Sequence, residues 1–200
     1  MQARQTVAAV VVLGMTMMSG CRVSSDKQGE NENVKIATPF GGMQVKTNDS
    51  VVAGGIGLPE YPGAEIIKKK DKNSGSADVN LSFGNFQLRV KAVGYRSTDK
   101  PEEVAAFYRK ALGRYGNVIQ CANNGPVGEP THTEEGLTCE NDKHINVEDV
   151  SGKMELKAGS KQHQHIVAID PEGNGTKIGL VVLDLPGHFS VGKGDEDNKQ

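Results

Sequence analysis

The stretch ADVNLSFGNFQLRVKAVGY, residues 77–95, decides the fold, because apolar and polar side chains alternate along most of its length. A period of two places the apolar residues on one face of a β-strand. Gly84-Asn85 interrupts the alternation and is typical of a two-residue hairpin turn, with glycine at the first turn position as a type II′ turn requires. The sequence therefore predicts an antiparallel hairpin. A single long strand with a bulge at Gly84 is the alternative interpretation.

A helix is predicted directly after this hairpin, over residues 99–115. Asp99 is a candidate N-cap, Pro101 is allowed in the first turn, and Glu102 stands three positions after the cap. Apolar side chains then recur at spacings of three and four up to Gly116, a typical C-terminal stop. This stripe predicts a helix that lies across a sheet. Its members are Val104, Phe107, Tyr108, Ala111, Leu112 and Tyr115.

Further strands are expected on both sides of these elements. The chain enters the main domain through the turn Pro62-Gly63, and residues 176–185 form the most apolar segment, expected at the centre of the sheet. The predicted fold class is α+β, with an antiparallel sheet of about five to seven strands and the 99–115 helix packed on one face. The other predicted strands are residues 64–69, 117–121, 136–140, 153–158 and 164–170.

A second, shorter hairpin is predicted at residues 34–47, around the turn Pro39-Phe40-Gly41-Gly42. Two isolated strands are marginally stable in water. The hairpin must therefore dock on its own domain, on a partner or on another copy. A Gly-rich linker is expected to follow, so that residues 34–57 join a tether to the main domain at residues 58–185.

The first twenty residues have the parts of an export signal. Arg4 is the single charge before an apolar run of thirteen residues, 6–18. As a helix this run spans roughly 20 Å, short of the ~30 Å hydrocarbon core of a bilayer. Residues 1–20 are therefore predicted to be a signal peptide. A plain secretory signal followed by an incidental cysteine is the alternative.

Met18-Ser19-Gly20-Cys21 resembles the bacterial lipobox, in which a leucine-like residue and two small residues precede the lipid-accepting cysteine. The resemblance implies a diacylglyceryl group on Cys21, cleavage before it, and acylation of the new amino terminus by a fatty acid such as palmitate. More than one acyl chain gives stable anchoring. Arg22 follows, and in enteric bacteria the absence of Asp there favours the outer membrane. The expected location is the cell envelope, facing the periplasm or the exterior.

Two polar segments flank the predicted domains. Residues 21–33 contain little to bury and are predicted to be a flexible tether, and residues 186–200 a disordered tail. The chain also resembles a recurrent module of bacterial envelope proteins, through the Tyr-Pro-Gly-Ala entry at 61–64 and the Phe107-Tyr108 pair on the helix. That resemblance implies a fold and no catalytic residue.

A cysteine pair and a histidine pair are candidate sites. Cys121 and Cys139 are an exported pair once Cys21 is lipidated, and a disulfide is the expected state, with free thiols or a metal site as alternatives. His163 and His165 stand one residue apart on a predicted strand, so both rings share a face. With His132, His144 or a carboxylate they are weak candidates for a metal site. An exposed strand face is the alternative.

Composition and motifs narrow the function. The net charge of −2 and the pI near 6.2 do not indicate nucleic-acid binding, which is typical of basic domains. Catalytic and phosphate-binding motifs are missing from the sequence, so neither an enzyme nor a cofactor is predicted. A basic run at residues 68–72 reads as a solvated strand end, or as a contact for acidic lipid or polyanionic cell-wall polymer.

The predicted function is a non-catalytic, lipid-anchored envelope protein that serves as a binding or assembly module. Its expected partners are the membrane, through the lipid on Cys21, and an envelope protein or cell-wall polymer. A periplasmic lipoprotein that binds a metal or a small ligand through His163 and His165 is the second hypothesis.

Overall fold

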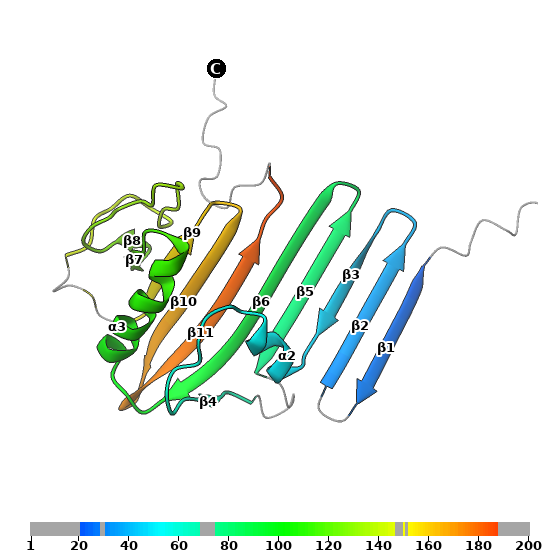
Figure 1. Cartoon of the computed structure of the whole chain (residues 1–200), viewed down its shortest axis with the longest axis horizontal. Coiled ribbons are helices and arrows are strands. Elements are labelled where there is room, and N and C mark those ends of the chain that lie inside the picture. Colours follow the sequence, from blue (N-terminus) through cyan, green and yellow to red (C-terminus); the bar gives the residue numbers. More distant parts are fainter. Residues whose placement is uncertain (1–20, 29–30, 69–74, 147–149, 151, 188–200) are drawn as a thin grey trace, which may run out of the picture.

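The computed structural model describes residues 21–28, 31–68, 75–146, 150 and 152–187. The predicted signal peptide, most of the predicted tail and most of the basic run at 68–72 lie outside these residues. The described chain forms one antiparallel sheet of eleven strands with one main helix (Figure 1). The strands are β1 (Arg22–Gln28), β2 (Asn31–Thr38), β3 (Gly41–Lys46), β4 (Glu65–Ile66), β5 (Ser76–Phe83), β6 (Phe86–Ser97), β7 (Ile119–Ala122), β8 (Gly125–Pro126), β9 (Met154–Gly159), β10 (His163–Glu172) and β11 (Gly175–Asp184).

The predicted hairpin is confirmed as β5 and β6. Phe83 is paired with Phe86, so Gly84 and Asn85 alone form the turn. Gly84 has a φ of 57°, and Asn85 is not among the residues with positive φ, as a type II′ turn requires. The alternative of a single bulged strand is therefore wrong.

The strand order is β1-β2-β3-β5-β6-β11-β10-β9-β7-β8, with the short β4 paired to β6. Strand β11 lies between β6 and β10, which confirms the central position predicted for residues 176–185. The broad α+β class is likewise confirmed. The expected five to seven strands are too few, mainly because residues 22–46 add three strands to the same sheet.

The main helix, α3 (Pro101–Leu112), continues as the 3-10 turn η1 (Gly113–Tyr115). The N-cap is Lys100, which makes no capping side-chain bond, so the prediction of Asp99 as the cap is wrong. Asp99 instead accepts a hydrogen bond of 2.7 Å from the Tyr61 hydroxyl. Burial, together with this bond to Asp99, raises the pKa of Tyr61 to about 12. The Asp99 carboxylate therefore binds Tyr61, a residue distant in the sequence, instead of capping the helix.

The main core lies between α3 and the sheet. Tyr108 and Leu112 are fully buried from the helix side, and Ile169, Ile178 and Leu180 from β10 and β11. Burial also raises the pKa of the Tyr95 and Tyr108 hydroxyls. The helix stripe predicted from spacing is therefore the buried face.

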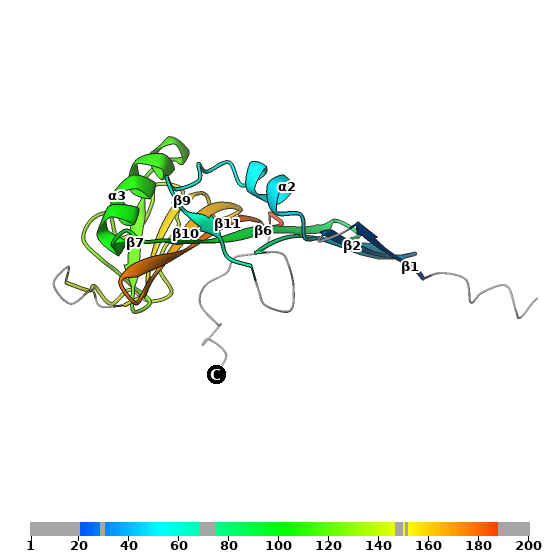
Figure 2. The same cartoon turned by 90° about the horizontal axis from the view of Figure 1, so that it is seen from below.

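A short helix, α2 (Asp49–Gly54), replaces the first part of the expected Gly-rich linker. Its Val52 and, just beyond it, Ile56 are buried in the main core. Figure 2 shows that α2 and α3 lie on the same face of the sheet. The segment is thus part of the packed domain.

Strands β1, β2 and β3 form what we call the wing, which extends beyond both helices as a single layer (Figure 2). The predicted 34–47 hairpin is β2 and β3, and it docks on its own domain through pairing of β3 with β5. Residues 22–28, expected to be part of a flexible tether, instead form the edge strand β1. Their backbone hydrogen bonds to β2 replace the missing hydrophobic burial.

The prediction of a strand at residues 136–140 is wrong. This segment contributes a single isolated bridge, between Thr138 and His132. Leu137 donates its backbone N–H to the Thr133 hydroxyl, and Thr133 donates its own N–H to Leu137. These local bonds hold the segment as a loop.

Candidate functional site

The two ends of the sheet differ in how their edges are closed. At β8, Ile145 donates its backbone N–H to Pro126 and Asn141 donates to Asn124, at 2.8 and 2.9 Å. A loop thus covers that edge. At β1, no strand of the described chain pairs with the outer side. An unpaired strand edge can accept a strand from another chain, so β1 is a candidate binding edge.

Cys21 lies at the beginning of this open edge. It is exposed and makes no disulfide. Arg22, the next residue, already pairs with Ala37 at the end of β2. The predicted lipid acceptor is therefore joined to the sheet without a spacer, and it lies near the turn between β2 and β3.

The face of the sheet opposite the helices carries rows of apolar side chains. On β6, Val93 and Tyr95 point to the helices, so Leu88 and Val90 point to the other face. The strand register continues their rows across the wing. Leu88, Leu81, Met43, Ile36 and Val23 form one row, and Leu183, Val90, Val79, Val45 and Val34 form the next.

The wing side chains in these rows are largely half-buried, since neighbours in each row shield one another. Neither α2 nor α3 covers them (Figure 2). Most stable domains bury a sheet face under a second layer. In the wing, this face is therefore an apolar surface without a helix on it.

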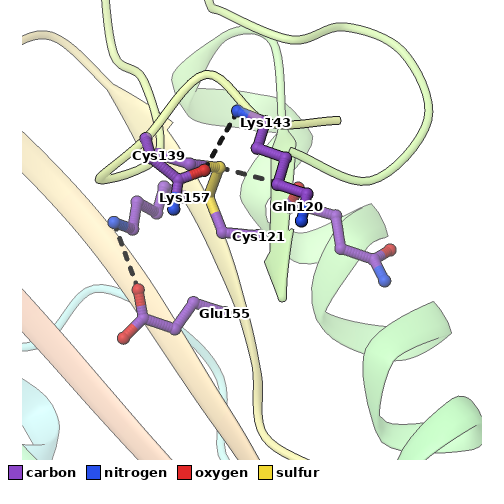
Figure 3. The surroundings of a disulfide bond; sticks show 7 residues. Gln120, Cys121, Cys139, Lys143, Glu155 and Lys157 are labelled. Atoms are coloured by element: carbon purple, nitrogen blue, oxygen red, sulfur yellow. Dashed lines mark hydrogen bonds and ion pairs between the residues drawn. A yellow bond between two sulfur atoms is a disulfide. The ribbon is translucent and has the colours of Figure 1, made fainter. Parts of the chain in front are cut away.

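Cys121 and Cys139 lie at disulfide distance, with Cα atoms 5.7 Å apart, in agreement with the expected bond. Figure 3 shows the pair above the sheet face that also carries Glu155 and Lys157, whose charged groups form an ion pair of 3.1 Å. With the cysteines, Ile119 and Leu137 form a small second core, separate from the one under α3. The bond ties the loop before Cys139 to β7, so its role here is structural.

His163 and His165 are on one face of β10, yet they have different partners. The His163 ring lies 3.0 Å from the Asp184 carboxylate and is exposed. The His165 ring stacks on Tyr115, with ring centroids 3.6 Å apart and planes at 14°. Tyr115 donates its hydroxyl to the Gly57 carbonyl at 2.7 Å, and Arg114 also donates to that carbonyl. The tertiary stack on Tyr115 has no sequence signal, since η1 and β10 are far apart in the chain.

These contacts separate the histidines as candidate ligands. The Nδ1 of His165 is buried and has no hydrogen-bond partner among the described residues. Neither His132 nor His144 joins them, and the described residues contain no group of three or more His, Cys, Asp or Glu side chains arranged to hold a metal ion. The predicted metal site therefore receives no third ligand from this part of the chain.

The protein is expected to lose stability as the pH falls, because burial of the His165 ring favours its neutral form. Burial lowers the pKa of this ring from 6.5, and the Arg114 cation lowers it further. Below pH 6.5 the unfolded chain therefore binds a proton more readily than the folded chain. The contribution is complete above that pH and is lost as the pH falls towards the lowered folded pKa.

Melting temperatures at about pH 7.5 and about pH 5 measure this effect. We expect a smaller acid-induced drop in His165→Phe, which keeps an aromatic ring on Tyr115. His144→Gln, which removes an exposed histidine outside this stack, is the matched control and should retain the wild-type drop. Equal drops in the wild type and His165→Phe would contradict the assignment.

None of the helices in the described part of the chain is long and apolar enough to cross a membrane. Comparison with protein-family models, with curated proteins and with solved structures finds no significant match to this chain.

Proposed function

We propose that this protein is a non-catalytic lipoprotein of the bacterial cell envelope, anchored through Cys21, in which the wing is a binding or assembly module. The observation that carries the proposal is the position of β1. This strand begins at the residue after the candidate lipid acceptor, and its outer edge is unpaired within the described chain. A partner strand added there gains backbone hydrogen bonds along β1.

Two further features support a binding role. The apolar rows of the wing lie on the side away from α2 and α3, so a partner at the edge also meets an apolar surface. Strand β1 itself offers short polar side chains at Ser24 and Ser25, which leave the backbone accessible. An envelope protein with an exposed strand fits this surface. We infer a protein partner because the open edge of β1 offers backbone hydrogen bonds to a strand, and not because of the charge of this surface.

Anchoring predicts a large change in location when Cys21 is replaced. We expect Cys21→Ala to lose fatty-acid labelling and to move from the membrane fraction to the soluble fraction, because the thiol is the only attachment point of the diacylglyceryl group. Metabolic labelling with palmitate and fractionation of a bacterial host measure both effects. The chain with Cys121→Ala and Cys139→Ala is the matched control and should remain labelled and membrane-bound. A labelled, membrane-bound Cys21→Ala chain contradicts the proposal.

The binding edge is tested by site-specific photocrosslinking in intact cells. A photoreactive residue at Ser24, on β1, should give a discrete adduct with another envelope protein. The same residue at Asn174, in the exposed turn between β10 and β11, is the control. Adducts that are absent at Ser24, or identical at the two positions, count against the open edge as the binding site.

A further inference from the structure

The most exposed large apolar side chains gather at one corner of the sheet, where β1 begins and where the turns β2–β3 and β5–β6 lie. Among the described residues, Phe40, Val23, Phe83 and Phe86 keep 83, 69, 47 and 37 % of their surface accessible. Val23 is near the beginning of β1, Phe40 is in the turn between β2 and β3, and the other two flank the turn between β5 and β6. Figure 1 shows these three places side by side at the upper end of the strands. We call Cys21 and these four residues the tip.

The strand register explains why the tip is contiguous. Gly41, next to Phe40, is paired with Phe83, and Phe83 is paired with Phe86. The Phe83 ring lies over Gly41, where its Cδ1 atom is 2.6 Å from the position that a Cβ would take. An aromatic ring packed over a strand glycine fixes the orientation of the ring. The sheet therefore holds the Phe83 side chain in place.

Charge in the segments that carry the tip residues is sparse and of one sign. Residues 21–24, 37–42 and 82–88 contain no Asp or Glu and a single cation, Arg22. Acidic groups return farther along β1 and β2, at Asp26 and Glu32. A surface that enters a lipid interface must avoid carboxylates, and a cation is favoured there by anionic lipids.

The link to Cys21 is short. Each residue spans at most about 3.5 Å of extended chain, and β1 begins one residue after Cys21. Strand alternation also places Val23, two residues after Cys21, on the side of β1 that carries the apolar rows. A lipid on Cys21 therefore holds the tip against the bilayer, where no flexible spacer separates the two.

We propose that the tip is a membrane-contacting surface that inserts its aromatic side chains into the interface of the bilayer that holds the lipid on Cys21. This inference rests on the proposed function for the anchor. A second copy of the chain is a less suitable occupant, because exposure is highest at the corner next to Cys21 rather than at the middle of the apolar face. The wing then stands on the membrane at this corner, which leaves the outer side of β1 accessible.

Tryptophan fluorescence provides the test, because the chain contains no Trp. The full chain is purified from bacterial membranes as Phe40→Trp, Phe86→Trp or Asn174→Trp, and each is reconstituted into phosphatidylcholine vesicles with and without brominated acyl chains. Flotation first establishes that the protein is bound to the vesicles. We expect blue-shifted emission and at least a twofold quenching by brominated lipid for Phe40→Trp and Phe86→Trp. Asn174→Trp, at the opposite end of the strands, should keep the emission of a water-exposed indole.

Failures of the tip and of the anchor are distinguishable. Floated protein in which Phe40→Trp and Asn174→Trp are equally unquenched overturns the tip and leaves the anchor intact. Emission of Phe40→Trp that is blue-shifted but insensitive to brominated lipid overturns it in favour of a protein interface. Equal quenching at all three positions also overturns it. Palmitate labelling of the same preparations tests the anchor separately, and a Cys21→Ser, Phe40→Trp chain that is still quenched by added vesicles supports the tip without the lipid.

Discussion

Replacing Leu180 by alanine is expected to lower the free energy of unfolding by about 3 to 4 kcal/mol, whereas Leu88→Ala should cost about 1 kcal/mol. Leu180 is 1 % exposed and packs under α3 in the main core. Its removal loses apolar burial and leaves a cavity that the rigid sheet cannot close. Leu88 is half-buried on the opposite face, where no helix covers it.

Denaturant unfolding followed by circular dichroism measures both values on the chain as purified. Because the two substitutions delete the same atoms from adjacent regions of one sheet, their difference isolates the effect of the second layer. Equal losses would mean that the sheet face around Leu88 on β6 is covered as tightly as the core, and would contradict the description of this face as uncovered.

Loss of the Cys121–Cys139 bond is expected to lower the free energy of unfolding by about 3 kcal/mol. The two cysteines are 18 residues apart in the sequence, and a cross-link over a loop of this size removes conformational freedom chiefly from the unfolded chain. The second core around Ile119 and Leu137 depends on the same loop. We therefore expect the loss to be concentrated in this part of the molecule.

Unfolding of the wild type with and without reductant measures the contribution of the bond. The chain with Cys121→Ala and Cys139→Ala should unfold at the lower value in both conditions, and Cys21→Ala should follow the wild type because Cys21 is exposed. A wild-type chain whose stability does not respond to reductant would show that the bond is absent or contributes nothing. Hydrogen exchange is expected to rise first in the loop between the cysteines.

Elements defined by local patterns were predictable from the sequence. Gly84-Asn85 set the register of β5 and β6, because a two-residue turn permits only one pairing of the flanking strands. The apolar stripe from Val104 to Leu112 defined the buried face of α3. Boundaries were less certain where a competing long-range partner exists, as at Asp99, whose carboxylate binds Tyr61 instead of capping the helix.

The candidate site was only partly predictable. Cys21 and the cysteine pair carry chemical signals in the residue types themselves, but exposure carries none. Phe40 and Phe83 read as ordinary turn and strand residues, and their gathering near Cys21 depends on pairing of β3 with β5. The environment of His165 was likewise not predictable from the sequence, since its ring stacks on Tyr115, which lies 50 residues earlier in the chain.

The sequence by itself determined the hairpin at residues 77–95, the buried face of the helix, the central strand at 176–185 and the expectation of a bond between Cys121 and Cys139. Each follows from side-chain periodicity, turn chemistry or residue type within a short window. Only the tertiary structure decided that residues 22–28 are a strand, that residues 49–54 are a helix, and that the apolar turns meet beside Cys21. Those outcomes depend on backbone hydrogen bonds and packing between distant segments, which leave no periodic trace in the polar sequence of β1.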